Sequence, residues 1–315
     1  MIIIGAGLSG IIAGHYFKQK NPHIQERQLY LPNNHHALLR FKTDKVSKVT
    51  NIPFKEGIVR KSILADGQFA DKSNPYLANT YSLKVLGKIV DRSIWDLEDG
   101  PRYVAPLDFI DQASKGLAIK LGKESFGVSN SSSAPIISTI PMPQMMDLVG
   151  WKNKPRFEAM PIWSIQVDII SPEVDVFQTI YYASLKDKYY RASITGNRLI
   201  IEYHLPPPKD EVGRDIDSIL GDFGIVPYAT NDPDPAARKH EYGKIAPIDE
   251  DLRKEFIYTM TREYNVYSLG RFATWKQILL DDVVDDCFVI SKLMASEGRR
   301  RQYHHSISTV KGTVS

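Results

Sequence analysis

The stretch Ile2-Ile3-Ile4-Gly5-Ala6-Gly7-Leu8-Ser9-Gly10, near the start of the chain, decides the fold. Three β-branched residues in a row predict a short, fully buried strand of a parallel sheet. Three glycines with the spacing G-x-G-x-x-G follow, and residues 11–19 continue as a predicted helix. This order of strand, glycine turn and helix predicts a Rossmann-type dinucleotide-binding domain.

Each glycine of the turn has its own physical role. Gly5 permits the tight turn, Gly7 lets the backbone approach a diphosphate, and Gly10 lets the helix pack on its strand. The unpaired N–H groups and positive dipole of a helix N-terminus favour phosphate binding. Leu8 and Ser9 belong to the same turn, so they are predicted to contact the cofactor together with the three glycines.

A dinucleotide site also needs an acidic residue about 20 residues further on, where it accepts hydrogen bonds from a ribose hydroxyl. Residues 23–27 are a plausible second strand, and Glu26 lies at its end. We therefore predict that Glu26 binds the ribose and that Arg27, directly after it, contacts the cofactor. A surface glutamate at a strand end is the alternative interpretation of Glu26.

The composition excludes several classes of protein. The chain has 315 residues, of which 43% are hydrophobic and 24% charged, with a formal net charge of +3, as in ordinary globular proteins. A single cysteine, Cys287, excludes an intramolecular disulfide and a cysteine-based zinc site, and no metal site is expected. No window approaches the ~20 apolar residues of a membrane span, and no secretory signal is visible. We expect a cytoplasmic protein that does not enter membranes.

The hydrophobic period changes in the second half of the chain. Between Trp163 and His204, apolar and polar residues alternate in segments separated by turn signals such as Gly196-Asn197, which predicts an antiparallel sheet. The expected fold class is α/β, a Rossmann-type FAD-binding domain with a second, antiparallel-sheet substrate domain. The first is predicted to comprise residues 1–50, 101–150 and 245–315, and the second residues 51–100 and 151–244.

The choice of FAD comes from residues 267–275, Tyr-Ser-Leu-Gly-Arg-Phe-Ala-Thr-Trp. This segment resembles the second flavin signature of the FAD-dependent amine oxidase superfamily, which includes protoporphyrinogen oxidase and UDP-galactopyranose mutase. In that family a strand ends at Gly-Arg beside the diphosphate, and a following helix directs its N-terminus at the flavin. The resemblance implies contacts to non-covalent FAD from Gly270, Arg271, Asp282 and Val283.

Two further segments resemble the same family. Residues 137–143 resemble its strand-and-proline turn near the flavin. Residues 117–126 resemble the strand pair whose backbone contacts adenine, which adds Phe126 to the implied cofactor contacts. Covalent attachment of the flavin is not expected, because Cys287 lies in a helical pattern and no histidine stands in an attachment motif.

The chain also departs from the family in two places. The arginine-bearing double-glycine motif that follows the ribose glutamate is replaced by residues 31–36, where His35 and His36 either approach the flavin or form a polar loop. Little helical sequence is expected between Asp66 and Pro106. The helical insertion that carries much of the mutase sugar-nucleotide site is therefore expected to be absent, which disfavours mutase activity.

Tyrosines are dense in the predicted substrate sheet, at Tyr181-Tyr182 and Tyr189-Tyr190-Arg191. In the mutases a Tyr-x-Arg in the corresponding sheet meets substrate phosphate, and the spacing here matches. Tyr181 and Arg191 therefore join His35 and His36 as candidate catalytic or substrate-binding residues. Tyrosines also pack well in sheets for structural reasons alone, and that alternative stays open.

The resemblance implies a FAD-dependent oxidoreductase that oxidises a C–N bond of an amine or amino-acid-like substrate by hydride transfer to the flavin. One alternative is a flavin-dependent enzyme that acts on an amino group attached to a DNA base or nucleotide. The basic run Arg299-Arg300-Arg301 is compatible with nucleic acid, although such tails are more often solvated ends. Further alternatives are a mutase-like, non-redox flavoenzyme on a sugar nucleotide and a flavin-binding protein without catalysis. The oligomeric state is left open.

Overall fold

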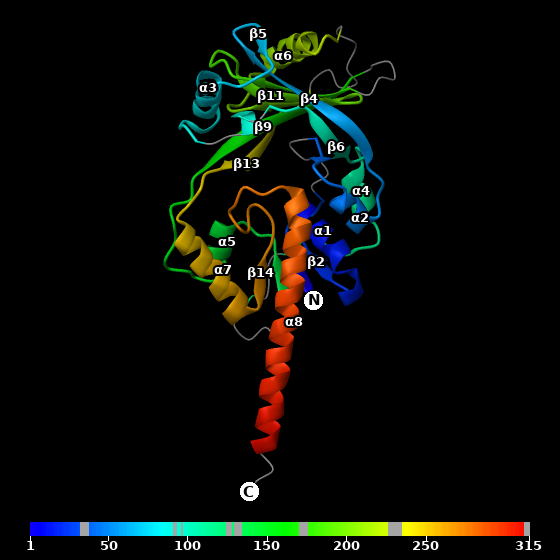
Figure 1. Ribbon diagram of the computed structural model, residues 1–315, viewed down its shortest axis with the longest axis vertical. Helices are drawn as coiled ribbons and strands as arrows, with labels where there is room; N and C mark the ends of the chain where they lie inside the picture. Colours follow the sequence, from blue (N-terminus) through cyan, green and yellow to red (C-terminus); the bar gives the residue numbers. More distant parts are fainter. Residues whose placement is uncertain are drawn as a thin grey trace.

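The computed structural model describes residues 1–31, 38–90, 93–95, 97–123, 128, 134–169, 176–225 and 235–311, with the side chains of the last helix described as far as residue 296. Two sheets form the frame of the protein, one with five strands and one with nine. In Figure 1 the nine-stranded sheet lies at one end with helix α6 on its outer side, and the five-stranded sheet lies below it among helices. The predicted α/β fold class is confirmed.

The five-stranded sheet is parallel and has β1 at its centre, with the isoleucines Ile3 and Ile4 buried as predicted. Because β2 pairs on one side of β1 and β8 on the other, the strand order reverses there. Such a switch point is where open α/β sheets bind ligands at the carboxyl ends of their strands. The strands, in spatial order, are β14 (Val266–Ser268), β8 (Ile136–Ser138), β1 (Ile2–Ile4), β2 (His23–Gln25) and β7 (Ala118–Lys120).

Helices bury both faces of this sheet, as its continuous apolar strands require. One face packs against α1 (Leu8–Tyr16), α2 (Lys45–Thr50), α4 (Phe109–Ser114) and the start of α8 (Leu280–Lys311). The other face packs against α5 (Met142–Leu148) and α7 (Glu250–Tyr264). A short 3-10 turn, η1 (Lys18–Lys20), follows α1.

The nine-stranded sheet contains the predicted antiparallel strands of the second half of the chain. The turn Gly196-Asn197 joins β11 to β12, with Gly196 at φ +57°, as the sequence predicted. Among the strand pairs described in the nine-stranded sheet, only β10 and β4 run parallel to each other. The order is β13 (Arg238–Ile245), β9 (Ala159–Asp168), β12 (Arg198–Tyr203), β11 (Tyr189–Thr195), β10 (Phe177–Tyr182), β4 (Lys55–Ala65), β6 (Gly100–Val104) and β3 (Arg40–Phe41), with β5 (Gln68–Ala70) on β4.

Strands β3 and β6 extend this sheet although they lie within residues 1–50 and 101–150, which were assigned to the FAD-binding domain. The predicted domain boundaries stay a prediction.

The two faces of the nine-stranded sheet differ in chemistry. The outer face is apolar, and residues such as Ile165, Ile194 and Ile201 pack against α6 (Lys209–Asp222). Because side chains alternate along a strand, the neighbouring positions face the five-stranded sheet. This inner face carries a group of polar side chains, namely Ser164, Gln166, Thr179, Arg191, Ser193, Thr195, Arg198 and Glu202.

Helix α3 (Pro75–Leu86) corrects one expectation, since little helical structure was expected between Asp66 and Pro106. The helix has clear local causes: the Asn74 side chain accepts a hydrogen bond from the Leu77 N–H at 2.9 Å, and proline stands in the first turn. Its apolar residues pack beside the inner face of the nine-stranded sheet. A short 3-10 turn, η2 (Ser93–Trp95), follows in the same region.

Helix α8 is longer than the predicted helix, which ended at Met294. Its first half packs on α1 and α2, and Figure 1 shows its second half extending beyond the body of the protein. Cys287 is fully buried in the packed half, as predicted. Across the part of the chain that the structure describes, none of the helices combines the length and apolarity needed to cross a bilayer.

Candidate functional site

The glycine turn after β1 has two kinds of glycine. Gly5 has φ +98° and a Cβ there would collide with the Thr139 hydroxyl, while a Cβ on Gly10 would collide with the Gly5 carbonyl oxygen. The fold itself therefore needs both. A Cβ on Gly7 would meet nothing within 4 Å, and its φ of −69° is open to any residue. Gly7 thus leaves open space at the N-terminus of α1, where a bound phosphate would touch backbone.

Glu26 lies beside this turn, at the end of β2. Its carboxylate accepts hydrogen bonds from the Ala6 N–H at 2.7 Å and from the Gln28 N–H at 3.0 Å. A carboxylate offers about four acceptor positions, so about two remain for hydroxyl groups of a ligand. The predicted ribose contact of Glu26 stays a prediction. Arg27, the next residue, has an exposed side chain.

The second predicted signature meets the first in space. The Leu269 N–H donates to the Ser138 carbonyl at 2.9 Å, which continues β14 to the carboxyl edge of the sheet. Gly270 then turns with φ +90°, and a Cβ there would collide with the side chain of Ser9. Segments some 260 residues apart in sequence, around Ser9 and Gly270, therefore close one surface. The next residue, Arg271, lies with its guanidinium 5.6 Å from the Phe272 ring.

A cavity of about 440 Å³ lies at this edge, between the two sheets. The N-terminus of α8 reaches it, with Val283 in its wall. Asp281 also lines the cavity, and its carboxylate accepts hydrogen bonds from the N–H groups of Lys42 and Thr43. The Asp282 carboxylate instead accepts from the Leu279 N–H at 2.7 Å, which caps the helix. The lining residues are Gly7, Leu8, Ser9, Leu38–Phe41, Ile110, Thr139, His240, Leu269–Phe272, Ile278–Asp281 and Val283.

The wall opposite the glycine turn has two ionisable side chains that the sequence reasoning missed, Arg40 and His240. His240 lies on β13, and its Nε2 is 2.8 Å from the Ser164 hydroxyl on the neighbouring strand β9. Burial lowers the pKa of His240, although the charge of Glu202 acts in the opposite direction. The imidazole is therefore mostly neutral at neutral pH and can accept a proton.

Arg40 stands on β3 and reaches across to strands β10 and β11. Its Nε donates to the Thr195 hydroxyl at 3.0 Å and its Nη1 to the Thr179 hydroxyl at 2.8 Å. Its Nη2 donates to the carbonyls of Gln178 and Ile194. Burial lowers the pKa of Arg40 to about 10, with a further contribution from the positive charge of Arg191. The arginine therefore ties the edge strand β3 to the β10–β11 pair of the same sheet.

The sequence candidates Arg191 and Tyr181 lie on the inner face but line neither this cavity nor the smaller one next to it. One edge of the Arg191 guanidinium pairs with Glu202, with Nε donating to Oε2 and Nη2 donating to Oε1 at 2.8 Å. Tyr181 packs edge-on against the Tyr81 ring of α3, at a centroid distance of 5.7 Å. Their roles toward a substrate stay predictions. His35, His36 and Phe126 lie outside the described residues.

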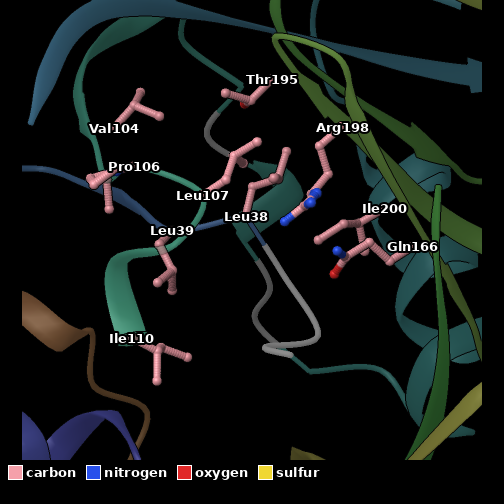
Figure 2. Close-up of a pocket in the computed structure, with 11 residues that line it drawn as sticks. Leu38, Leu39, Val104, Pro106, Leu107, Ile110, Gln166, Thr195, Arg198 and Ile200 are labelled. Atoms are coloured by element: carbon pink, nitrogen blue, oxygen red, sulfur yellow. The ribbon is translucent and has the colours of Figure 1, made fainter. Parts of the chain in front are cut away.

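A second cavity of about 40 Å³ continues from the first toward the sheet, sharing Leu38, Leu39 and Ile110 with it. Figure 2 shows Arg198 and Gln166 entering from the nine-stranded sheet, opposite the leucines. Arg198 is neutralised by Asp168, with Nε to Oδ1 at 2.7 Å and Nη2 to Oδ2 at 3.0 Å. The smaller cavity is therefore apolar on the side of Leu38, Leu39 and Ile110 and polar on the side of the nine-stranded sheet.

No family model and no curated protein matches the sequence. Solved structures do match. A reduced UDP-galactopyranose mutase matches with a TM-score of 0.65 at 13% identity, over 93% of this chain and 95% of that one. A protoporphyrinogen oxidase-like protein from Exiguobacterium sp. 255-15 matches with a TM-score of 0.62 at 11% identity, over 95% and 98%. A fatty acid isomerase from P. acnes matches with 0.57 at 10% identity, over 92% and 97%. The chain therefore shares the fold of these proteins, two of which are of the kinds that the sequence resemblance named.

Proposed function

We propose that the protein is a FAD-dependent oxidoreductase that oxidises a C–N bond of an amine or amino-acid-like substrate. The main support for a FAD cofactor is the open space beside Gly7. Among the glycines of the turn, Gly5 and Gly10 are explained by contacts within the chain, whereas at Gly7 a side chain would enter open space at a helix N-terminus. A dinucleotide phosphate explains why that space exists.

The residues present fit FAD along the carboxyl edge of the five-stranded sheet. Glu26 would hold the adenosine ribose, and the backbone at Gly7 and Gly270 would meet the diphosphate. The N-terminus of α8, with Val283 in the cavity wall, would face the flavin ring. When bound there, the flavin would accept the hydride that leaves the carbon next to the substrate nitrogen.

The protein's own contribution to the chemistry would be to remove a proton and to exclude water. An amine is protonated in water, and hydride departure requires the nitrogen lone pair of the neutral form. His240 lies in the cavity wall, where its imidazole would act as the base that takes this proton. Apolar side chains such as Leu39, Phe41 and Ile278 would keep bulk water from the reacting carbon. The imine formed would leave and be hydrolysed in solution.

The test begins with the colour of the purified protein. We expect a yellow protein that releases FAD on denaturation. Under anaerobic conditions, primary amines, amino acids and an aminoalkyl nucleotide are then mixed with it, and loss of the oxidised flavin absorbance is followed. Reduction by one of these supports the proposal. A protein that binds NAD and not FAD contradicts the cofactor, and a FAD protein that no amine reduces contradicts the oxidase reaction.

A mutase-like, non-redox reaction is the second candidate, since a UDP-galactopyranose mutase is among the matching structures. The residue expected to bind substrate phosphate in that case is Arg191. Its guanidinium is already paired with the buried carboxylate of Glu202, which speaks against that role. Isotope exchange at the anomeric carbon of a sugar nucleotide, in the presence of chemically reduced protein, distinguishes this reaction from amine oxidation.

A further inference from the structure

Three arginines of the sheet-to-sheet boundary differ in how their charge is balanced. Arg191 is paired with Glu202 and Arg198 with Asp168. Arg40 contacts two hydroxyls and two carbonyls, and among the residues that the structure describes it forms no ion pair with a carboxylate. Neutral dipoles fix its position without cancelling its charge.

Such a charge is costly away from water unless an anion balances it. The neighbouring charges increase the cost, because Arg191 and Arg102 both disfavour the protonated form of Arg40 and so lower its pKa. A purely structural tie between β3 and the β10–β11 pair needs no charge, since neutral donors could bond the same oxygens. Arg40 lines the cavity, so an anion bound in the cavity would balance its charge.

We propose that Arg40 binds the anionic group of the substrate, so that the cavity selects small organic carboxylates over neutral analogues. This inference deepens the proposed function, on which it rests for the reacting carbon, by naming an amino acid or amino-carboxylate as the substrate class. Hydroxyls at Thr179 and Thr195 hold the guanidinium rigidly, so little ordering is needed when the carboxylate arrives.

The remaining walls fit the same substrate class. Leu38, Leu39 and Ile110 line the cavity beside Arg40 and suit an apolar side chain. His240, in the same cavity, suits the amino group, since a neutral imidazole accepts a proton that a second cation could not. An arginine for the carboxylate and a histidine for the nitrogen would together orient the carbon between them.

The experiment compares three probes with the same ring: benzoate, benzamide and phenylphosphonate. Binding to the purified, FAD-saturated protein is measured by isothermal titration calorimetry, which needs no catalysis. We expect benzoate to bind at least 10-fold more tightly than benzamide. We expect Arg40→Met to weaken benzoate binding about 10- to 100-fold and benzamide binding little, with Arg40→Lys between Met and wild type.

Arg198→Met is the matched control, because Arg198 lies on the adjacent cavity but is already neutralised by Asp168. It should leave the benzoate affinity within about twofold of wild type. Equal binding of benzoate and benzamide to the wild type overturns the proposal, as does the absence of binding by either. Equal losses in the Arg40 and Arg198 variants also overturn it. Tighter binding of phenylphosphonate than benzoate rejects the carboxylate and identifies a phosphate-bearing substrate.

The binding titration tests the role of Arg40 independently of the proposed oxidoreductase function. Should the protein bind no FAD, the oxidoreductase proposal fails, yet the same titration of the flavin-free protein still tests the preference for benzoate. If Arg40→Met does not fold, the proposal is tested by the Arg40→Lys variant and by the comparison of benzoate with benzamide in the wild type.

Discussion

The carboxyl edge of the five-stranded sheet and the inner face of the nine-stranded sheet enclose one cavity in opposite ways. At the first, Gly7 and Gly270 have no side chain, so the backbone itself forms part of the cavity surface. At the second, long side chains such as Arg40 and His240 extend inward and are held by hydroxyls on other strands of that sheet. Backbone recognition suits a phosphate that every dinucleotide shares, whereas side chains can be changed singly to suit one substrate.

The largest expected effect concerns the side-chain region. Glu202→Ala leaves the half-buried Arg191 without its carboxylate and should lower the free energy of unfolding by about 3–5 kcal/mol. Denaturant unfolding measures this. Asp168→Ala, which removes the half-exposed partner of Arg198, is the control and should lower it by about 1 kcal/mol at most. Equal losses would mean that burial does not distinguish the two pairs.

The same pair predicts a dependence on pH. Burial alone would raise the pKa of Glu202, but the charges of Arg191 and Lys244 and the hydrogen bonds from Arg191 hold that pKa below its ordinary value. The stability it contributes is then complete above the unfolded carboxyl pKa of about 4.3 and is lost as the pH falls through the lowered value. The difference between wild type and Glu202→Ala should shrink below about pH 4.

The second prediction tests the backbone region. Gly7→Val should weaken FAD binding at least 100-fold while leaving the unfolding temperature of the flavin-free protein nearly unchanged, because its side chain enters space that the chain does not use. Gly10→Val is the counterpart and should destabilise the fold by about 3 kcal/mol through collision with the Gly5 carbonyl. Flavin absorbance after gel filtration and thermal unfolding separate the two effects. Full flavin occupancy in Gly7→Val would place the cofactor elsewhere.

A third prediction concerns proton removal. His240→Gln should slow flavin reduction by an amine about 100-fold near neutral pH. Burial lowers the pKa of His240, so the wild-type rate should stay constant through neutral pH and fall only as the pH drops through that lowered pKa. His204→Gln is the control, since burial also lowers the pKa of His204 but this residue does not line the cavity. Stopped-flow pH profiles that are the same for both variants would remove His240 from the reaction.

The smallest expected effect is at the ribose contact. Glu26→Gln keeps one acceptor oxygen but loses the charge, so the FAD dissociation constant should rise about tenfold. Equilibrium titration of the flavin-free protein with FAD measures it. An unchanged constant would leave Glu26 with only its two backbone hydrogen bonds and no part in cofactor binding.

The backbone region could be predicted from the sequence because its signals are local. The β-branched run Ile2–Ile4, the glycines after it and Glu26 lie within one short segment, and the structure places them together. The β11–β12 hairpin is similar, since Gly196-Asn197 specifies its own turn. Helix α3 was missed because its cap at Asn74 and its proline follow a polar stretch that hides the start of the helix.

The side-chain region could not be predicted in the same way. Arg40 has no motif, and its partners Thr179 and Thr195 lie 139 and 155 residues away. Arg191 had a matching motif, but its pairing with Glu202 depends on the register between β11 and β12, which places the two residues opposite each other. The sequence supplies the charges, and only the strand register decides which of them are already neutralised.

Because Cys287 is buried, the reactivity of its thiol reports whether helix α8 is docked on the rest of the protein. This thiol is the only one in the chain, it is fully buried in α8, and burial raises its pKa to about 12. A maleimide can therefore react only when α8 separates from α1 and α2. Because the same helix begins at the cavity wall, the labelling rate measures how often the cofactor end of the molecule opens, without any engineered probe.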